Sequence, residues 1–248
     1  MNTLVTYRLE DSIATITMDD GKVNVLSPGM LAELGDALDR AKADQAVVVL
    51  TSTARAFCAG FDLGVLGRGD AETYALVRAG FELAARVLSF PRPVVIACPG
   101  HAVAMGVFLL LSSDYRVGAE GSYKITANEV ALGMTMPRPA IEICRQRLAP
   151  AHFNRAVLLA EVYSPGNAVA AGFLDRIVPA AELGAAARTT AAELAKLDMD
   201  AHAATKLRVR EQILTWIRTD IASAAGLGIP QDTQDPQDAR AAQGARDA

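Results

Sequence analysis

The sequence has little of what marks a secreted, membrane or redox protein. It contains only three cysteines, Cys58, Cys98 and Cys144, and their spacing is typical of neither a metal site nor a redox pair. The longest apolar run, residues 102–111, is too short to cross a bilayer. Residues 1–11 lack a basic region followed by an apolar run, so we expect no signal peptide. These absences predict a cytoplasmic protein with buried thiols and no membrane contact.

Neither sign of charge dominates, and aromatic side chains are few. The chain has 24 Lys and Arg against 28 Asp and Glu, and its basic residues are scattered, which predicts no contact with nucleic acid. Aromatic residues make up 5% of the chain, whereas 51% of its 248 residues are hydrophobic. Such a chain can bury a sizeable aliphatic core, either as one large domain or as a core with a small appendage.

Strand and helix patterns alternate along the first half of the chain. Residues 5–9 and 13–18 alternate in the strand manner around a polar turn, which predicts a hairpin. Ser27 before Pro28 is typical of a helix N-terminus. Further expected elements are a strand at 46–52, a helix at 71–90, a strand at 93–98, a helix at 106–112 and a strand at 115–117. After Pro139 we expect mostly helices, at 141–148, 151–161, 168–171, 180–197 and 202–225, with a strand at 174–178. This order predicts an α/β fold with substantial parallel pairing.

Two turns of small residues follow two of the apolar strands. The strand at 46–52 runs on into Phe57-Cys58-Ala59-Gly60-Phe61-Asp62-Leu63. The strand at 93–98 runs into Pro99-Gly100-His101-Ala102-Val103-Ala104-Met105-Gly106, which opens a helix. Glycine lets a backbone approach a ligand closely, and a helix start leaves N–H groups unpaired. Two such donors converging on one oxygen would form an oxyanion hole, which predicts chemistry on a carbonyl group.

These two segments resemble signature motifs of the crotonase superfamily. Residues 128–133, Asn-Glu-Val-Ala-Leu-Gly, are similar to a third motif, and residues 171–178 match a further stretch. Order and spacing agree from about residue 5 to residue 210, and the chain looks closest to members labelled enoyl-CoA hydratase. The resemblance implies an α/β fold, a crotonase-like spiral of ββα units with a helical C-terminal trimerisation region. It also implies acyl-CoA thioester substrates and no separate cofactor, because coenzyme A is part of the substrate.

The resemblance further implies which residues perform the chemistry. The backbone N–H groups of Phe61 and Met105 are the oxyanion donors, and Gly60 and Gly106 permit their turns. Glu129 is the acid and base, and its apolar neighbours predict desolvation that raises its pKa. The remaining substrate-binding residues at matching positions are Lys22, Val23, Ala59, Asp62, Leu63 and Phe108. Residues 21–24 would cradle coenzyme A, with Lys22 near a phosphate, and residues 63–78 would cover the acyl tail.

Phe108 departs from the pattern of typical hydratases in this superfamily. They carry a second catalytic glutamate two residues after the second-motif glycine, where this chain has Phe108. Hydration needs a water held between two carboxylates, so the loss of one should cripple it. One glutamate and an oxyanion hole suffice to move a double bond. We therefore expect isomerisation between 3-enoyl-CoA and 2-enoyl-CoA in fatty acid metabolism. The alternatives are an enoyl-CoA hydratase, as the overall resemblance indicates, and a non-catalytic acyl-CoA-binding homologue.

Other polar residues have plainer interpretations. Asp62 is expected to hold its loop by accepting backbone N–H bonds. Glu142 would replace the missing carboxylate only if its helix faces the pocket, and a solvated helix face is the simpler interpretation. Asp114 and His101 are expected to be structural, and Cys58 to be a core thiol because no partner lies at a suitable spacing.

We divide the chain into three parts. Residues 1–197 form the core with the active site, residues 198–228 form C-terminal oligomerisation helices, and the polar residues 229–248 form a disordered tail. The apolar stripe that predicts a partner surface, and hence a homotrimer or hexamer, is Leu207, Ile213, Leu214, Ile217 and Ile221. Lys206 and Arg208 either reach a neighbour's coenzyme A phosphates or lie on a solvated helix face.

Overall fold

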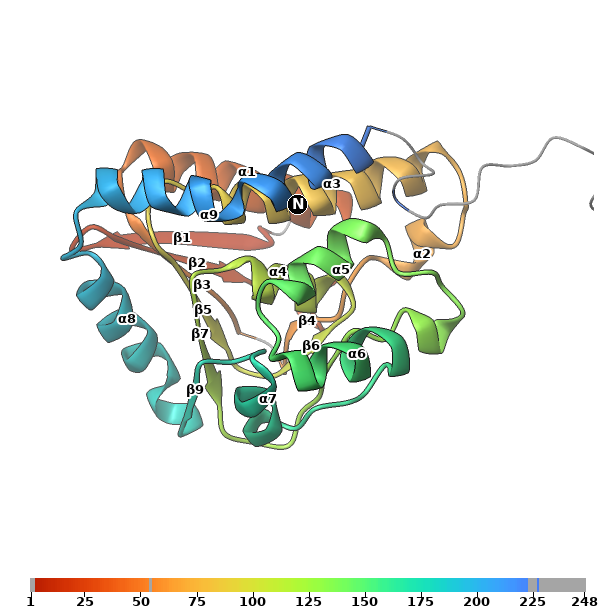
Figure 1. The fold of residues 1–248 in the computed structure, drawn as a ribbon. Helices are drawn as coiled ribbons and strands as arrows, with labels where there is room; N and C mark the ends of the chain where they lie inside the picture. The colour runs from red at the N-terminus through yellow and green to blue at the C-terminus, as the bar shows by residue number, and fades with distance from the viewer. Residues whose placement is uncertain (1–2, 54, 223–226, 228–248) are drawn as a thin grey trace, which may run out of the picture.

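Six strands form the larger of two sheets in the structure, a computed structural model that describes residues 3–53, 55–222 and 227 (Figure 1). Their order across the sheet is β1-β2-β3-β5-β7-β9. The strands are β1 (Val5–Glu10), β2 (Ile13–Met18), β3 (Val47–Ser52), β5 (Val94–Cys98), β7 (Tyr115–Ala119) and β9 (Arg176–Val178). β1 and β2 form the predicted antiparallel hairpin, and every later pair is parallel. The expected α/β fold with parallel pairing is confirmed.

A second sheet of three very short strands was not predicted. It contains β4 (Ala56–Cys58), β6 (His101–Val103) and β8 (Ile125–Thr126), paired in parallel in that order. The two glycine turns therefore follow β4 and β6, and not the long strands β3 and β5 as the sequence indicated. Strands of two or three residues are too short to show an alternating pattern, so periodicity cannot detect them.

Helices cover both faces of the larger sheet. On one face, α1 (Pro28–Ala43), α3 (Ala71–Leu88) and α9 (Met199–Asp220) lie side by side, and on the other face α8 (Leu183–Leu194) packs against β3, β5 and β7 (Figure 1). The remaining α-helices of the described residues are α2 (Leu63–Leu66), α4 (Met105–Ser112), α5 (Arg138–Arg145), α6 (Pro150–Leu159) and α7 (Pro165–Ala171). The short 3₁₀-helices are η1 (Val130–Leu132) and η2 (Ala180–Glu182).

Local chemistry explains where the helices begin. Ser27 caps α1, and its hydroxyl accepts a hydrogen bond from the Met30 N–H at 3.2 Å, as the sequence predicted. Pro28 occupies the first turn, where its missing N–H costs nothing. α4 differs because all of its eight residues are buried, so it forms the centre of the molecule rather than a surface layer.

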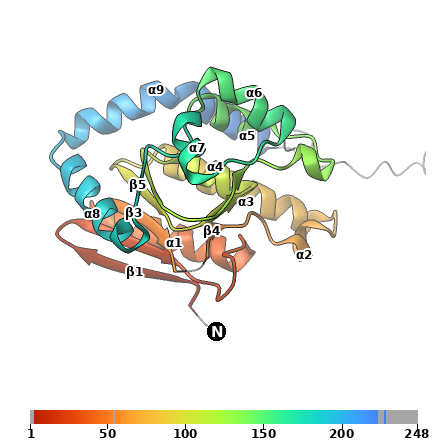
Figure 2. The same ribbon diagram turned by 90° about the horizontal axis from the view of Figure 1, so that it is seen from below.

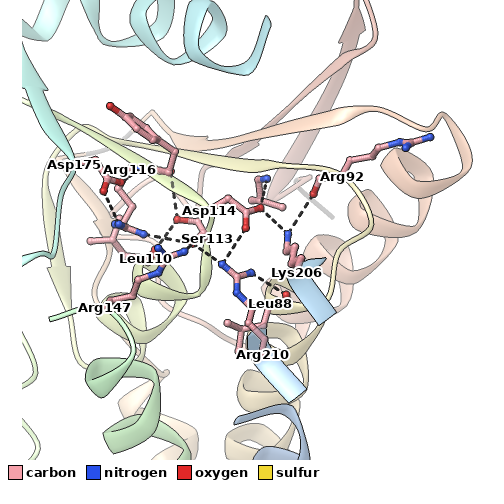
Figure 3. Close-up of polar contacts among 12 residues, drawn as sticks. Leu88, Arg92, Leu110, Ser113, Asp114, Arg116, Arg147, Asp175, Lys206 and Arg210 are labelled. Carbon is pink, nitrogen blue, oxygen red and sulfur yellow. Dashed lines mark hydrogen bonds and ion pairs between the residues drawn. The ribbon is translucent and has the colours of Figure 1, made fainter. Parts of the chain in front are cut away.

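α9 is fastened to the body by a buried ionic cluster (Figure 3). The Asp114 carboxylate accepts hydrogen bonds from Lys206 Nζ at 2.6 Å and from the Val94 N–H at 2.7 Å, and it pairs with Arg210 Nη2 at 2.9 Å. Arg210 Nη1 also donates to the Leu88 carbonyl at 2.8 Å. Lys206 and Arg210 are only 6% and 5% exposed. Asp114 is structural, as expected, whereas Lys206 is committed within its own chain and does not lie on a solvated face.

The apolar stripe of α9 is also satisfied within the chain. Ile213, Leu214 and Ile217 are buried where α9 crosses α3 and α5, and Figure 2 shows α9 running from the end of α8 toward α5. Leu207 remains 46% exposed. The stripe therefore does not require a second copy, which removes the reason given for a partner surface there.

Three further sequence predictions concern cysteines, membrane contact and the tail. Cys58, Cys98 and Cys144 are buried and free, as expected. Among the described residues, none of the helices combines the length and apolar character needed to span a membrane. The predicted tail, residues 229–248, lies outside the described residues.

The ionic cluster predicts that Asp114→Asn will destabilise the fold strongly. The substitution leaves two buried cations without their counter-charge, and breaking a buried pair in this way costs about 3–5 kcal/mol. Urea denaturation monitored by circular dichroism measures the loss. The matched control is Glu193→Gln, which breaks the exposed pair between Glu193 and Lys196 and should cost less than about 1 kcal/mol. Equal stabilities of the two variants would contradict this account of α9.

Candidate functional site

Three turns meet at one edge of the small sheet. Phe61 lies three residues after the end of β4, Met105 two residues after the end of β6, and Glu129 three residues after the end of β8. The strands are parallel, with Cys58 opposite Ala102 and Val103 opposite Thr126, and the register of β4 against β6 shifts between Ala56 and Cys58. Neighbouring strands lie about 4.8 Å apart, so the segments that leave their carboxyl ends are brought together. The structure thus gathers the three residues that the sequence assigned to chemistry.

Gly60 brings the first turn against the second. Its φ of +91° is a conformation that L side chains rarely adopt. A Cβ placed on Gly60 would lie 3.0 Å from Ala104 Cβ and 3.6 Å from the Met105 nitrogen. Leu26 holds the turn from the other side, because its N–H donates to the Gly60 carbonyl at 2.8 Å and its carbonyl accepts from the Asp62 N–H. Gly60 permits its turn, as predicted.

Gly106 serves a different purpose from the one the sequence indicated. Its φ is not in the left-handed region; instead, an added Cβ would fall on the Cys58 carbonyl oxygen, 2.9 Å from Cys58 Cβ. The glycine therefore allows the start of α4 to lie directly on β4. The unusual backbone belongs to Ala104, with φ 51° and ψ −127°, and its N–H is held by the Thr126 carbonyl at 3.1 Å.

The Phe61 and Met105 N–H groups remain available as donors. Within the described part of the chain, neither donates a hydrogen bond to another residue. Met105 is the first residue of α4, where a helix has no acceptor for its own N–H groups and its dipole favours negative charge. Met105 is buried and Phe61 half-buried. The two turns, which approach each other at Gly60 and Ala104, thus each carry one backbone N–H without an acceptor among the described residues.

Glu129 is the titratable group of this edge. It is only 6% exposed, and its Oε2 atom accepts no hydrogen bond from any described residue. Burial disfavours the charged carboxylate and raises the pKa of Glu129 to about 7. A carboxyl group with this pKa can both accept and return a proton near neutral pH.

Phe108 sits in the first turn of α4 with its ring stacked on Phe81 of α3. The ring centroids are 6.4 Å apart and the planes differ by 19°, and both side chains are buried. Glu142 is the other carboxylate that the sequence offered for this position. It lies on α5 and its carboxylate accepts a hydrogen bond from Arg145 Nε at 3.0 Å. Glu142 is thus engaged in an ion pair, and because its side chain is only 15% exposed, the expected solvated position is wrong.

Other candidates take the structural roles expected of them. Asp62 caps α2, and its carboxylate accepts a hydrogen bond from the Gly64 N–H at 2.8 Å. His101 Nδ1 accepts a hydrogen bond from the Lys124 N–H at 3.1 Å. Burial raises the pKa of the Cys58 thiol to about 12, so this thiol is protonated at neutral pH and is no nucleophile.

The loop with Lys22 and Val23 lies against the first turn. The Ala59 N–H donates to the Val23 carbonyl at 3.2 Å, which joins the loop to the segment that carries Gly60. Asp20 shapes the loop, because its carboxylate accepts hydrogen bonds from the N–H groups of Lys22 and of two following residues. Sequence reasoning missed Asp20, although an aspartate directly before Gly21 is a recognisable turn signal. Lys22 and Val23 are exposed, and Leu63 is 73% exposed.

Comparison with known proteins agrees with this geometry. The family model described as enoyl-CoA hydratase/isomerase matches residues 8–236. A structure named as an enoyl-CoA isomerase of Mycobacterium tuberculosis is 47% identical, with a TM-score of 0.87, and the match covers 91% of this chain and 99% of that one. Another structure from this organism, named as a probable enoyl-CoA hydratase, is also 47% identical, with a TM-score of 0.86 and coverage of 90% and 94%. A structure titled as an enoyl-CoA hydratase of Mycobacterium ulcerans is 48% identical, with a TM-score of 0.85 and coverage of 88% and 96%.

A curated relative is more distant in sequence. The mitochondrial enoyl-CoA delta isomerase 1 of Rattus norvegicus is 30% identical over 195 residues, which cover 77% of this chain and 68% of that protein. Relatives with this fold thus carry the names of both hydratases and isomerases. The chain belongs to the enoyl-CoA hydratase/isomerase family of the crotonase superfamily.

Proposed function

We propose that the protein isomerises 3-enoyl-CoA to 2-enoyl-CoA. The proposal rests on the number of carboxylates at the site. Glu129 is a desolvated carboxylate, and the position of a second one is taken by the aromatic side chain of Phe108. Moving a double bond requires one group that takes a proton from one carbon and returns it to another. Hydration also requires a group to activate water, and the position that would hold it is filled by a stacked ring.

In the proposed reaction, Glu129 removes one proton from the substrate and returns the same proton to a different carbon. The thioester carbonyl oxygen accepts hydrogen bonds from the Phe61 and Met105 N–H groups, which stabilise the negative charge that develops on it. Glu129 removes a proton from C2, and the electron pair of that C–H bond enters a dienolate that spans C2 to C4 and the carbonyl. The protonated Glu129 then delivers the proton to C4, which leaves the double bond between C2 and C3.

The remaining predicted residues would bind the substrate. Lys22 and Val23 would contact coenzyme A, since their loop adjoins Ala59. Leu63 stands in α2, at the start of the segment that we assign to the acyl tail. The hydratase alternative draws support from the name of the Mycobacterium ulcerans relative. The binding-protein alternative is disfavoured by Glu129, because burying an ionisable group is costly and serves binding of a neutral thioester poorly.

The proposal includes a homotrimer or hexamer and a cytoplasmic location. Since α9 buries its apolar stripe in its own chain, contacts between copies would use another surface. Leu158, Leu159 and Val162 offer one, because they are neighbouring apolar side chains and each is more than half exposed.

We expect the wild-type protein to convert a 3-enoyl-CoA to its conjugated isomer and to hydrate crotonyl-CoA poorly. Glu129→Gln keeps the shape of the side chain but removes the base, so isomerisation should fall by at least about 10²-fold. The absorbance of the conjugated thioester follows both reactions. Glu142→Gln is the matched control and should retain the wild-type rate. Fast hydration of crotonyl-CoA by the wild type would favour the hydratase, and tight binding of both thioesters without turnover would favour the binding protein.

The raised pKa of Glu129 predicts how activity depends on pH. Proton removal requires the carboxylate form, so kcat/KM should rise with pH and level off above an apparent pKa of about 7. Initial rates between pH 5 and pH 9 measure this profile. A profile that is flat between pH 6 and pH 8 would contradict the role of Glu129 as the base.

The same pKa predicts an effect on stability. Between pH 4.5 and about 7, folded Glu129 keeps a proton that the unfolded chain has released, so this group makes the fold less stable as the pH rises through that range. Glu129→Gln should therefore gain stability relative to wild type between pH 4 and pH 8, by on the order of 3 kcal/mol. Denaturant unfolding at the two pH values measures the difference. A difference that does not change with pH would show that Glu129 is solvated.

Phe108→Glu should raise hydration of crotonyl-CoA if the aromatic side chain is what prevents it. The new carboxylate would occupy the position from which hydratases activate water. An unpaired buried carboxylate costs several kcal/mol or stays protonated, so the fold is checked by circular dichroism. Phe108→Leu is the control that removes the ring without adding a base. Equal hydration by the folded Glu and Leu variants would show that the missing carboxylate is not the limiting feature.

A further inference from the structure

α3 has a glycine in its interior, at a position where glycine does not stabilise the helix. Gly80 is the tenth of 18 residues in α3 and is buried. Its φ is not in the left-handed region, so the turn of the helix does not require glycine. Glycine is the least favourable residue in a helix interior after proline, so its presence calls for a packing reason.

The reason lies in the side chain of Phe61. A Cβ on Gly80 would lie 2.5 Å from Cζ of Phe61, whereas ordinary contacts begin at 3.4 Å. The same Cβ would lie 3.6 Å from Cγ of Met105. The Phe61 ring thus packs directly on the backbone of α3 at Gly80, beside the Met105 side chain. Both residues that supply the proposed oxyanion donors meet at this one helix position.

Two hydrogen bonds with Leu26 hold the backbone around Phe61. Leu26 fixes the carbonyl before Phe61 and the N–H after it, at 2.8 and 3.3 Å. The N–H of Phe61 donates to no other described residue. It shares a planar peptide unit with the Gly60 carbonyl, so its direction depends on the hydrogen bond from Leu26 and on where the Phe61 Cα is placed. The packing of the ring against Gly80 further constrains the position of the Phe61 Cα, because a single methylene group connects the ring to that atom.

We propose that Gly80 is a positioning residue that orients the Phe61 N–H by admitting its ring to the surface of α3. The inference rests on the proposed function of Phe61 as an oxyanion donor. With alanine at this position, the ring would have to retreat by about 1 Å to restore ordinary contact. Misplacement on that scale can cost a reaction up to about 10²-fold when it moves a group that must be aligned.

The test is a double-mutant cycle between Gly80→Ala and Phe61→Ala. Phe61→Ala keeps the backbone N–H but removes the ring, so it should relieve the clash that Gly80→Ala creates. Alone, Gly80→Ala should lower kcat for 3-enoyl-CoA isomerisation by roughly 10–100-fold and change KM by less than about threefold, because oxyanion donors act mainly on the transition state. In the Phe61→Ala background, the same substitution should change kcat by less than about twofold.

The matched control is Gly184→Ala in α8. Gly184 is also a helical glycine, but an added Cβ there meets nothing within 4 Å. This variant should keep wild-type kcat, which separates the clash from the general effect of alanine in a helix. If Gly80→Ala fails to fold while the double variant folds, the clash with Phe61 is supported. Failure of both to fold would overturn the inference.

A second readout does not depend on turnover. In protein labelled with ¹⁵N at its seven phenylalanines, the Phe61 amide resonance is identified by its loss in Phe61→Ala. Gly80→Ala should shift this resonance, and Gly184→Ala should leave it in place. If the resonance shifts but wild-type protein turns over neither thioester, the proposed function fails and the positioning role stands. An unmoved resonance, or an equal kcat loss by Gly80→Ala with and without the Phe61 ring, would overturn the inference.

Discussion

The site depends on one constraint: three short parallel strands must end at the same edge. β4, β6 and β8 contain only two or three residues each, yet their register decides where the following residues lie. In the proposed oxyanion hole two backbone donors converge on a single oxygen, so a shift of either turn by one residue would aim a different N–H at it. Gly106 lets the start of α4 lie directly on β4, because a Cβ at this position would collide with Cys58. The larger sheet, with α8 on one face, provides the rigid support from which the small sheet is built.

Two energetically unfavourable features lie at the edge of the small sheet. Ala104 adopts a backbone conformation that costs an L residue about 1–3 kcal/mol. Glu129 is buried with one oxygen lacking any hydrogen bond from the described residues. A residue keeps such an unfavourable conformation only where the surrounding structure fixes it. At Ala104 this support comes from α4, which begins at the next residue and is entirely buried. Burial is unfavourable for Glu129 as a structural residue, but it raises the pKa toward the range that the proposed role as a base requires.

Much of this could be predicted from the sequence, and the failures share a physical cause. Long elements show their period over many residues, so the opening hairpin and the α1 N-cap at Ser27 were predicted correctly. The motif residues Phe61, Met105 and Glu129 do lie at one edge. Strands of two or three residues carry no period, so the sheet that assembles them was missed. An apolar stripe indicates that one face of a helix is buried, but it does not indicate which chain buries it. For this reason the sequence predicted that the apolar face of α9 contacts a partner subunit. The effect of Gly80 depends on a contact between residues 19 positions apart, which local sequence patterns do not reveal.

The choice between hydration and isomerisation cannot be settled by overall similarity, because relatives of nearly equal identity, 47% and 48%, carry different names. The difference must lie in the few groups that meet the substrate. An isomerase needs a proton acceptor that keeps its proton long enough to return it, and water at the site would compete for the intermediate. Phe108, stacked on Phe81 in the first turn of α4, removes a carboxylate and fills its place with an apolar ring. In the proposed isomerase, this one aromatic residue both lacks the group that would activate water and occupies the space where that water would lie. That double effect favours the reaction in which Glu129 alone carries the proton.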